Sequence, residues 1–228
     1  MKAFLIYVKD HLESTAQAEK ALLSCKDTGF DVELVEGITP LTVDVYNELS
    51  HCPGSRASHF FKQSEIKYKT KKSCFMNNVK IWEKCIELNE PVVFLEHDIG
   101  CVRNYTEEDF EDVLILNIES AMKQKVFNHI KYKRKWKTGI HEYEYPPLAY
   151  RHNVSQWAGA YIMPGNGAYA ITPKAAKKLL DSAYTYGWEQ GDHFINTANV
   201  TIQYIVPEYF TFKSENLNMS HGWENEEN

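Results

Sequence analysis

Two carboxylates, Glu96 and Asp98, follow four consecutive apolar residues in the stretch VVFLEHDIG, residues 92–100. A short apolar run of this kind is typical of a strand buried in an α/β protein. Side chains two positions apart on an extended chain point the same way, so both carboxylates would face one point. Oxygen ligands aimed at one point suit Mg²⁺ or Mn²⁺, typically shared with a substrate diphosphate. The alternative is a solvated acidic turn, because charge pairs also gather at strand ends.

The segments before this stretch predict a parallel sheet. Residues 3–8 form a short apolar run, residues 14–25 place small and apolar side chains on one helical face, and residues 31–35 alternate as in a strand. Strand, helix and strand at this spacing favour a βαβ unit. Ligands of parallel α/β sheets bind outside the carboxyl ends of the strands, which is where the two carboxylates would lie.

The rest of the chain continues the α/β pattern. Helical spacing predicts a helix over residues 74–90, ended by Pro91, and Thr172-Pro173 predicts the start of another helix, which Gly187 would end. Further strands are expected at residues 113–118, 167–171 and 202–206. We expect one domain over residues 1–228, with long loops or insertions at 37–72 and 121–157 and a C-terminal tail at 213–228.

Length and composition place the chain among ordinary globular proteins. Its 228 residues suffice for one domain, and the formal net charge of −6 argues against a generic nucleic-acid binder. Apolar runs are too short for a signal peptide or a transmembrane segment. Five cysteines without metal-ligand spacing predict free thiols in a reducing compartment. We therefore expect a cytoplasmic protein, or one of the host cytoplasm if it is viral.

The order of several short motifs resembles glycosyltransferase family 25, the lipopolysaccharide and collagen galactosyltransferase-like group. Members of that family carry a Gly/Ser-Cys-x-x-Ser-His-x-x-x-Trp helix, followed by a strand that ends in Glu-Asp-Asp. Cys74 and Trp82 fit the first motif, with Asn77 and Asn78 in place of Ser-His. Residues 95–98, Leu-Glu-His-Asp, fit the second motif, with a histidine in place of the middle acid.

Later segments extend the resemblance over roughly residues 3–210. Residues 167–171 are similar to the family's Gly-x-x-Gly-Tyr-x-Ile/Leu-Ser segment, residues 188–192 are similar to its late acidic segment, and Pro207 lies where a proline closes the last strand. The resemblance implies a GT-A-like, Rossmann-like α/β fold with a mostly parallel sheet flanked by helices. It also implies a nucleotide-sugar donor, a divalent ion and inversion at the transferred anomeric carbon.

In such a transferase, Mn²⁺ or Mg²⁺ would neutralise the nucleoside diphosphate leaving group as a Lewis acid. Asp98 is the first choice for a metal ligand, and Glu96 either binds the metal or hydrogen-bonds the donor ribose. His221, in the tail, is the candidate third ligand, although a lone tail histidine is commonly just solvated. The expected donor is a sugar nucleotide, with UDP-sugars favoured. Its candidate contacts are Tyr7, Val8, Asn78, Glu96, His97 and Asp98.

Inverting transfer requires a base that takes the proton of the acceptor hydroxyl. Asp192 is the first candidate and Glu189 the second, although both could simply solvate a loop or cap a helix. Asn166 and Gly167 are candidates for binding the acceptor, because Gly165 and Gly167 around Asn166 indicate close approach of the backbone to a ligand. A plain tight turn is the competing explanation.

Two basic segments, residues 62–72 and 123–137, suit a polyanion, and Lys133, Arg134 and Lys135 are further candidates for acceptor binding. An anionic glycan is the first choice of acceptor, DNA with hydroxylated bases the second, and a protein side chain is also open. Two other functions compete with transfer: a metal-dependent phosphohydrolase and a catalytically inactive sugar-nucleotide-binding domain.

Overall fold

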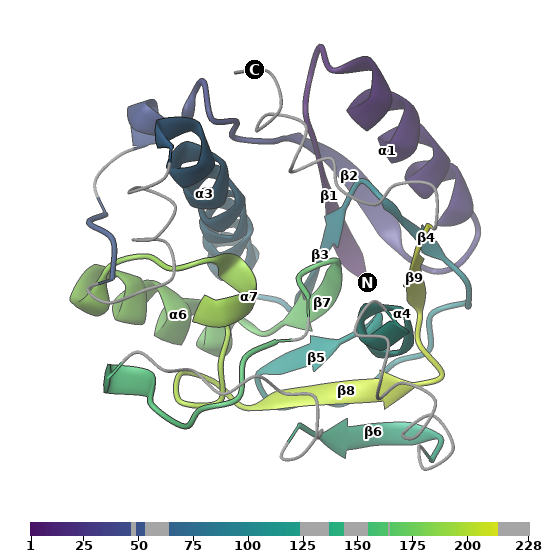
Figure 1. Ribbon diagram of the computed structural model, residues 1–228. Coiled ribbons are helices and arrows are strands. Elements are labelled where there is room, and N and C mark those ends of the chain that lie inside the picture. Colours follow the sequence, from purple (N-terminus) through teal and green to yellow (C-terminus); the bar gives the residue numbers. More distant parts are fainter. Residues whose placement is uncertain (47–48, 53–63, 124–136, 144–154, 164, 214–228) are drawn as a thin grey trace.

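A seven-stranded sheet, in the order β2-β1-β3-β7-β5-β8-β6, runs through the middle of the molecule (Figure 1). The computed structural model describes residues 1–46, 49–52, 64–123, 137–143, 155–163 and 165–213. The strands are β1 (Lys2–Tyr7), β2 (Asp31–Glu36), β3 (Val92–Glu96), β5 (Val113–Ile115), β6 (Gly139–Glu142), β7 (Ala168–Ile171) and β8 (Ile202–Val206). Only β7 and β6 oppose the common direction, so five of the seven strands are parallel in orientation.

Helices cover both faces of this sheet. The long helix α3 (Glu65–Leu88) lies on one face with α6 (Pro173–Tyr186) and the short α7 (Gly191–Phe194), whereas α1 (Leu12–Ser24) lies on the other (Figure 1). Alternate residues of the strands point to the two layers: Phe4 and Phe94 pack toward α3, and Leu5 and Leu95 pack toward α1. Burial on both faces explains why these strands read as continuous apolar runs. The predicted Rossmann-like α/β architecture with a mostly parallel sheet is confirmed.

A second, two-stranded sheet lies beside α1. It pairs β4 (Ile99–Cys101) with β9 (Phe210–Phe212) in antiparallel orientation. The remaining described elements are α4 (Ile118–Lys123) and the 3₁₀ turns η1 (Val43–Tyr46) and η2 (Ser155–Trp157). The small sheet matters for the site, because β4 starts directly after Asp98 and β9 ends next to Lys213.

Several local predictions are confirmed. The Thr172 side chain accepts a hydrogen bond from Ala175 N, Pro173 opens α6, and Gly187 ends it with a φ of 84°. All five cysteines are free thiols. Across the described ranges, no helix is both long and apolar enough to cross a bilayer.

Three local predictions are wrong. Residues 65–72, predicted as part of a loop, form the first two turns of α3, where Lys69 pairs with Glu65 at 2.8 Å and with Asp44 at 2.9 Å. Residues 139–142, in the second predicted loop, form the edge strand β6 against β8. The strand expected over 113–118 stops at Ile115, and α4 begins at Ile118. In the first two cases a distant partner contributes, Asp44 for α3 and β8 for β6, and periodicity within a short segment does not record it.

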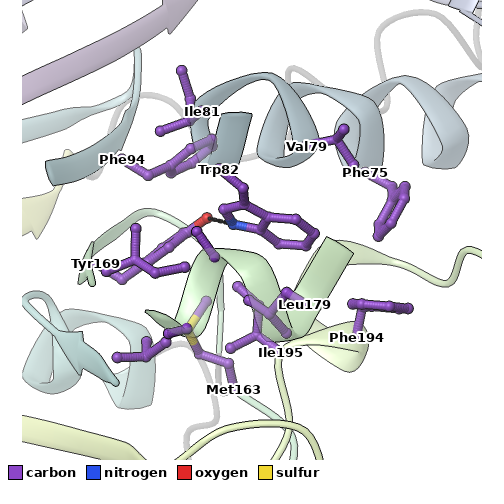
Figure 2. Close-up of a cluster of buried hydrophobic side chains, with 14 of the residues drawn as sticks. Phe75, Val79, Ile81, Trp82, Phe94, Met163, Tyr169, Leu179, Phe194 and Ile195 are labelled. Carbon is purple, nitrogen blue, oxygen red and sulfur yellow. Dashed lines mark hydrogen bonds between the residues drawn. The ribbon is translucent and has the colours of Figure 1, made fainter. Parts of the chain in front are cut away.

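A buried hydrogen-bonded group joins α3 to the sheet. Trp82 Nε1 donates to Tyr169 Oη at 3.0 Å, as Figure 2 shows, and Tyr169 Oη donates to Asn78 Oδ1 at 2.7 Å. The Tyr169 ring stacks on Phe94 with ring centroids 5.1 Å apart. All four side chains are at most 2% exposed. If one of these groups loses its hydrogen-bond partner, it stays buried with neither protein nor water to bond, and the protein loses stability.

We expect Tyr169→Phe to lower the free energy of unfolding by about 1–3 kcal/mol, because it leaves the Trp82 indole N–H without an acceptor. Urea denaturation measures this difference. Tyr184→Phe is the matched control: Tyr184 is 67% exposed, and its change should stay within about 0.5 kcal/mol. Equal effects of the two substitutions would contradict the importance of the buried hydroxyl.

Candidate active site

The ends of β3 and β5 meet the start of β7 at one edge of the sheet. Glu96 N donates to Gly167 O at 2.9 Å, and Leu116 N donates to Ala168 O at 3.0 Å. Since β7 is antiparallel to its neighbours, its first residues lie where the other strands finish. Three predicted site residues, Glu96, Asn166 and Gly167, are thereby brought together.

Glu96 is the last residue of β3, whereas Asp98 lies in the turn before β4. The two carboxylates are therefore placed by a turn, and the prediction that strand alternation aligns them is wrong. Loss of solvent, and then the negative charges of Asp98 and Asp192, raise the pKa of Glu96 well above its ordinary value, while Lys71 opposes this shift. The structure thus places two further carboxylates and one lysine within electrostatic reach of Glu96.

Asp98 is the most constrained of these acids. Burial raises the pKa of Asp98 to about 6, and the positive charge of Lys213 opposes the increase. Its Oδ1 atom is buried and has no hydrogen-bond partner among the described residues. Buried polar atoms are nearly always paired, so an unpaired carboxylate oxygen marks a place for a ligand, an ion or water.

His97, between the two acids, is uncharged at neutral pH. Burial, helped by the nearby His11, lowers the pKa of His97 to about 4. His11 itself begins α1, where its Nδ1 accepts a hydrogen bond from Ser14 N at 3.3 Å. The position that is acidic in the resembling motif therefore carries no charge in this chain.

One face of α3 lies toward the acids. Lys71, Cys74 and Asn78 follow one another at intervals of three and four residues, which places them on the same side of a helix. Burial raises the pKa of Cys74 to about 11; the charges of Glu96 and Asp192 also raise it, and that of Lys71 lowers it. Its thiol is thus protonated at neutral pH and unsuited to act as a nucleophile. Lys71 was predicted only as part of the basic segment 62–72; its place beside the acids was not predicted, although its spacing from Cys74 was a usable signal.

Asn78, predicted to contact the donor, is fully buried and held by protein groups. Its Nδ2 donates to Cys74 O at 2.9 Å, and its Oδ1 accepts from Tyr169 Oη and from Asn166 Nδ2 at 2.9 Å. Gly191 packs directly against this pair: a Cβ there would lie 2.7 Å from Asn78 Nδ2. Close packing of α7 against Asn78 is what brings the next residue, Asp192, to the site.

The two candidate bases occupy different environments. Asp192 is half-buried on α7 and influences both Glu96 and Cys74 electrostatically. Glu189 is 0% exposed, accepts a hydrogen bond from Gln190 N at 3.1 Å, and lies 3.9 Å from His193 Nδ1. It is not among the groups that shift the pKa of Glu96.

Tyr7 and Val8 lie at the end of β1, where backbone groups are held by neighbours. Val8 N donates to Ser14 Oγ at 2.8 Å, and Tyr7 O accepts from Gly37 N at 2.7 Å. Asn77 fixes the segment after β2, because its side chain bonds both the N–H and the carbonyl of Ile38. These hydrogen bonds hold the end of β1 at the edge of the sheet where the parallel strands finish.

Four predicted residues lie outside the described part of the chain: Lys133, Arg134, Lys135 and His221. Within the described part, no group of three or more His, Cys, Asp or Glu side chains is arranged to hold a metal ion. The last described residue before His221, Lys213, lies at the site, because its N donates to Asp98 O at 3.1 Å.

We expect Gly167→Ala to destabilise the protein by about 1–3 kcal/mol, because overpacking forces neighbours to move. A Cβ at Gly167 would overlap the Phe212 ring and lie 2.9 Å from Asn117 Nδ2. Gly165→Ala is the matched control, since its Cβ would meet nothing closer than 3.8 Å. Chemical denaturation of both variants tests this, and a Gly167→Ala protein as stable as the control would refute the close contact.

Comparison with known proteins agrees with the motifs. The profile of Glycosyltransferase family 25 (LPS biosynthesis protein) matches residues 9–195. No curated protein matches the chain. Mouse xyloside xylosyltransferase 1 is 11% identical, with 85% of this chain and 80% of that chain covered and a TM-score of 0.37. The galactosyltransferase LgtC, solved with donor and acceptor sugar analogues, is 12% identical, with 90% and 73% covered and a TM-score of 0.42. The family profile spans most of the chain and includes the carboxylates at the end of β3, and the chain therefore belongs to glycosyltransferase family 25.

Proposed function

We propose that this glycosyltransferase moves a sugar from a nucleotide-sugar donor to an acceptor hydroxyl with the help of a divalent cation. The observation that carries the proposal is the gathering of Glu96, Asp98 and Asp192 at the edge where the strands end. In parallel α/β sheets that edge is where ligands bind. We favour a UDP-sugar as the donor, as the resemblance of the motifs suggests.

The residues at this edge fit a divalent cation. Asp98 offers a buried Oδ1 without a described partner, and Glu96 is a second oxygen donor beside it. Carboxylates that repel each other in a desolvated place gain from a cation, and hard oxygen donors suit Mn²⁺ or Mg²⁺. His221 follows Lys213 by eight residues, and eight extended residues span up to about 28 Å. That reach supports His221 as a third ligand. When bound, the cation would stabilise the charge of the departing diphosphate.

Asp192 is the group best placed to accept the proton of the acceptor hydroxyl. It is half-buried, so a substrate can approach it, and it shares an electrostatic environment with Glu96. Glu189 is enclosed and already has Gln190 N and His193 as neighbours. Inversion at the anomeric carbon, which the family resemblance implies, needs such a base for direct displacement, and we propose that outcome.

For the acceptor we favour an anionic glycan. The name of the matching family refers to lipopolysaccharide biosynthesis, and the basic segment 123–137 suits a negatively charged partner. The same segment would also suit DNA that bears hydroxylated bases, which remains the second choice.

We expect Asp98→Asn to abolish the effect of metal on donor binding while leaving the fold intact, since the change removes charge and little volume. Calorimetric titration with UDP-, GDP-, CMP- and dTDP-sugars, with Mn²⁺ and with EDTA, measures it. In the wild-type protein Mn²⁺ should lower the dissociation constant of the best ligand about tenfold or more, and in the variant by less than about threefold.

The same titrations separate the competing functions. Wild-type binding of phosphate esters alone would favour a phosphohydrolase, and no response to any sugar nucleotide would favour an inactive domain. Asp98→Asn binding with an undiminished Mn²⁺ effect would show that the cation lies elsewhere.

We expect Asp192→Asn to lower turnover by about 10²-fold or more while donor affinity stays within about threefold, because a general base acts on the chemical step. Release of nucleoside diphosphate reports turnover. Glu189→Gln is the control, and it should keep most of the activity. If Glu189→Gln is inactive and Asp192→Asn active, the assignment of the base is reversed.

A further inference from the structure

A chain of hydrogen bonds with a fixed direction runs from the core to the candidate site. It starts at Trp82, whose indole N–H can only donate, and it does so to Tyr169 Oη at 3.0 Å. The Tyr169 hydroxyl lies 2.7 Å from Asn78 Oδ1 and gives its own proton there. Because Tyr169 Oη accepts from Trp82, it donates its proton to Asn78 Oδ1, and Asn78 Oδ1 can only accept.

The orientation of the Asn78 amide is set from both ends. Its Nδ2 donates to the carbonyl of Cys74 at 2.9 Å, and a carbonyl can only accept. Exchanging O and N at Asn78 would therefore place two acceptors face to face. Its Oδ1 must point toward Tyr169 and Asn166, so Asn166 must offer its Nδ2, at 2.9 Å.

The remaining amide atom of Asn166 is thereby fixed as an acceptor. Its Oδ1 is buried and finds no hydrogen-bond partner in the described ranges. Asn166 lies between the acidic strand end and α7: the next residue, Gly167, accepts from Glu96 N, and a Cβ on Gly191 would lie 3.1 Å from Asn166 Nδ2. The residue that carries this acceptor thus adjoins Gly167, which bonds Glu96, and packs against Gly191, the neighbour of Asp192.

We propose that Asn166 Oδ1 accepts a hydrogen bond from a sugar hydroxyl of the substrate and makes that hydroxyl a requirement for recognition. The proposal rests on the proposed function, since it needs a sugar in the site. At Asn166 Oδ1 the substrate must present an O–H group that donates a hydrogen bond, and a group that can only accept one is rejected. A site built to bond a hydroxyl discriminates strongly against an analogue that lacks it, because its own polar atom is left unpaired.

The test is a cycle of ligand and protein changes, measured as dissociation constants with Mn²⁺ present. UDP-glucose, UDP-galactose and their deoxyfluoro analogues, position by position, are titrated into wild type and Asn166→Ala. At one ring position the wild type should prefer hydroxyl over fluorine by about tenfold or more, and Asn166→Ala by less than about threefold.

Two further variants separate recognition from damage to the fold. Asn166→Asp keeps an oxygen toward the ligand, so it should keep the preference for hydroxyl even if the protein is less stable. Asn199→Ala removes a half-buried asparagine whose Nδ2 and Oδ1 are already bonded to Phe194 O and Ser182 Oγ. It should leave the preference as in the wild type.

The hydroxyl could belong to either sugar, and a second arm distinguishes the two. If the acceptor provides the hydroxyl, Asn166→Ala leaves donor affinity unchanged and raises the KM for methyl galactoside, the test acceptor. The preference of the wild type for methyl galactoside over one of its deoxyfluoro analogues is then lost in Asn166→Ala. Donor binding without Asn166-dependent discrimination in either arm overturns this inference alone. Failure of every sugar nucleotide to bind the wild type overturns the proposed function, and this inference with it.

Discussion

Repulsion of Glu96 by Asp98 and Asp192 is the constraint on which the site depends. Burial disfavours the charged forms of Glu96 and Asp98, and the charges of Asp98 and Asp192 further disfavour the charged form of Glu96. A fold keeps such a cluster only if the surrounding elements hold it against separation. Here β3, its following turn and α7 fix the three acids, and the hydrogen bond from Glu96 N to Gly167 O ties β3 to β7 at that edge. A cation or a positively charged side chain is the natural counterpart.

The helix α3 links the acidic site to the buried core. Its C-terminal half packs Trp82 into the core against Phe75 and Phe194, and one turn earlier Asn78 bonds the strand β7 through Tyr169. The same face continues to Cys74 and Lys71 beside the acids. The helix α3 thus connects the buried aromatic layer, through Trp82, to the charged edge, through Cys74 eight residues earlier.

Much of this could be predicted from the sequence, and the failures share a cause. The caps of α6, the buried strands and the position of Glu96 at a strand end follow from local chemistry and short periodicity. Residues 65–72 and β6 were missed because the ion pair of Lys69 with Asp44 and the pairing of β6 with β8 join them to distant segments. In the site, the contact of Gly191 with Asn78 and the bond of Asn78 to Asn166 join residues about ninety to a hundred and ten positions apart. No local pattern records such contacts.

His97 shows how the chain moderates the repulsion. In the resembling motif the middle position is acidic, so a third negative charge would stand between the two at the strand end. The His97 side chain is neutral at pH 7, because burial lowers its pKa to about 4. Its presence therefore reduces the charge at the turn and leaves Glu96 and Asp98 as the oxygen donors there. Asp192 adds the third carboxylate from a different element, α7, so in the function that we propose the acid assigned to the acceptor is separate from the pair assigned to the cation. In that proposal, binding of the cation and removal of the proton depend on residues from different elements.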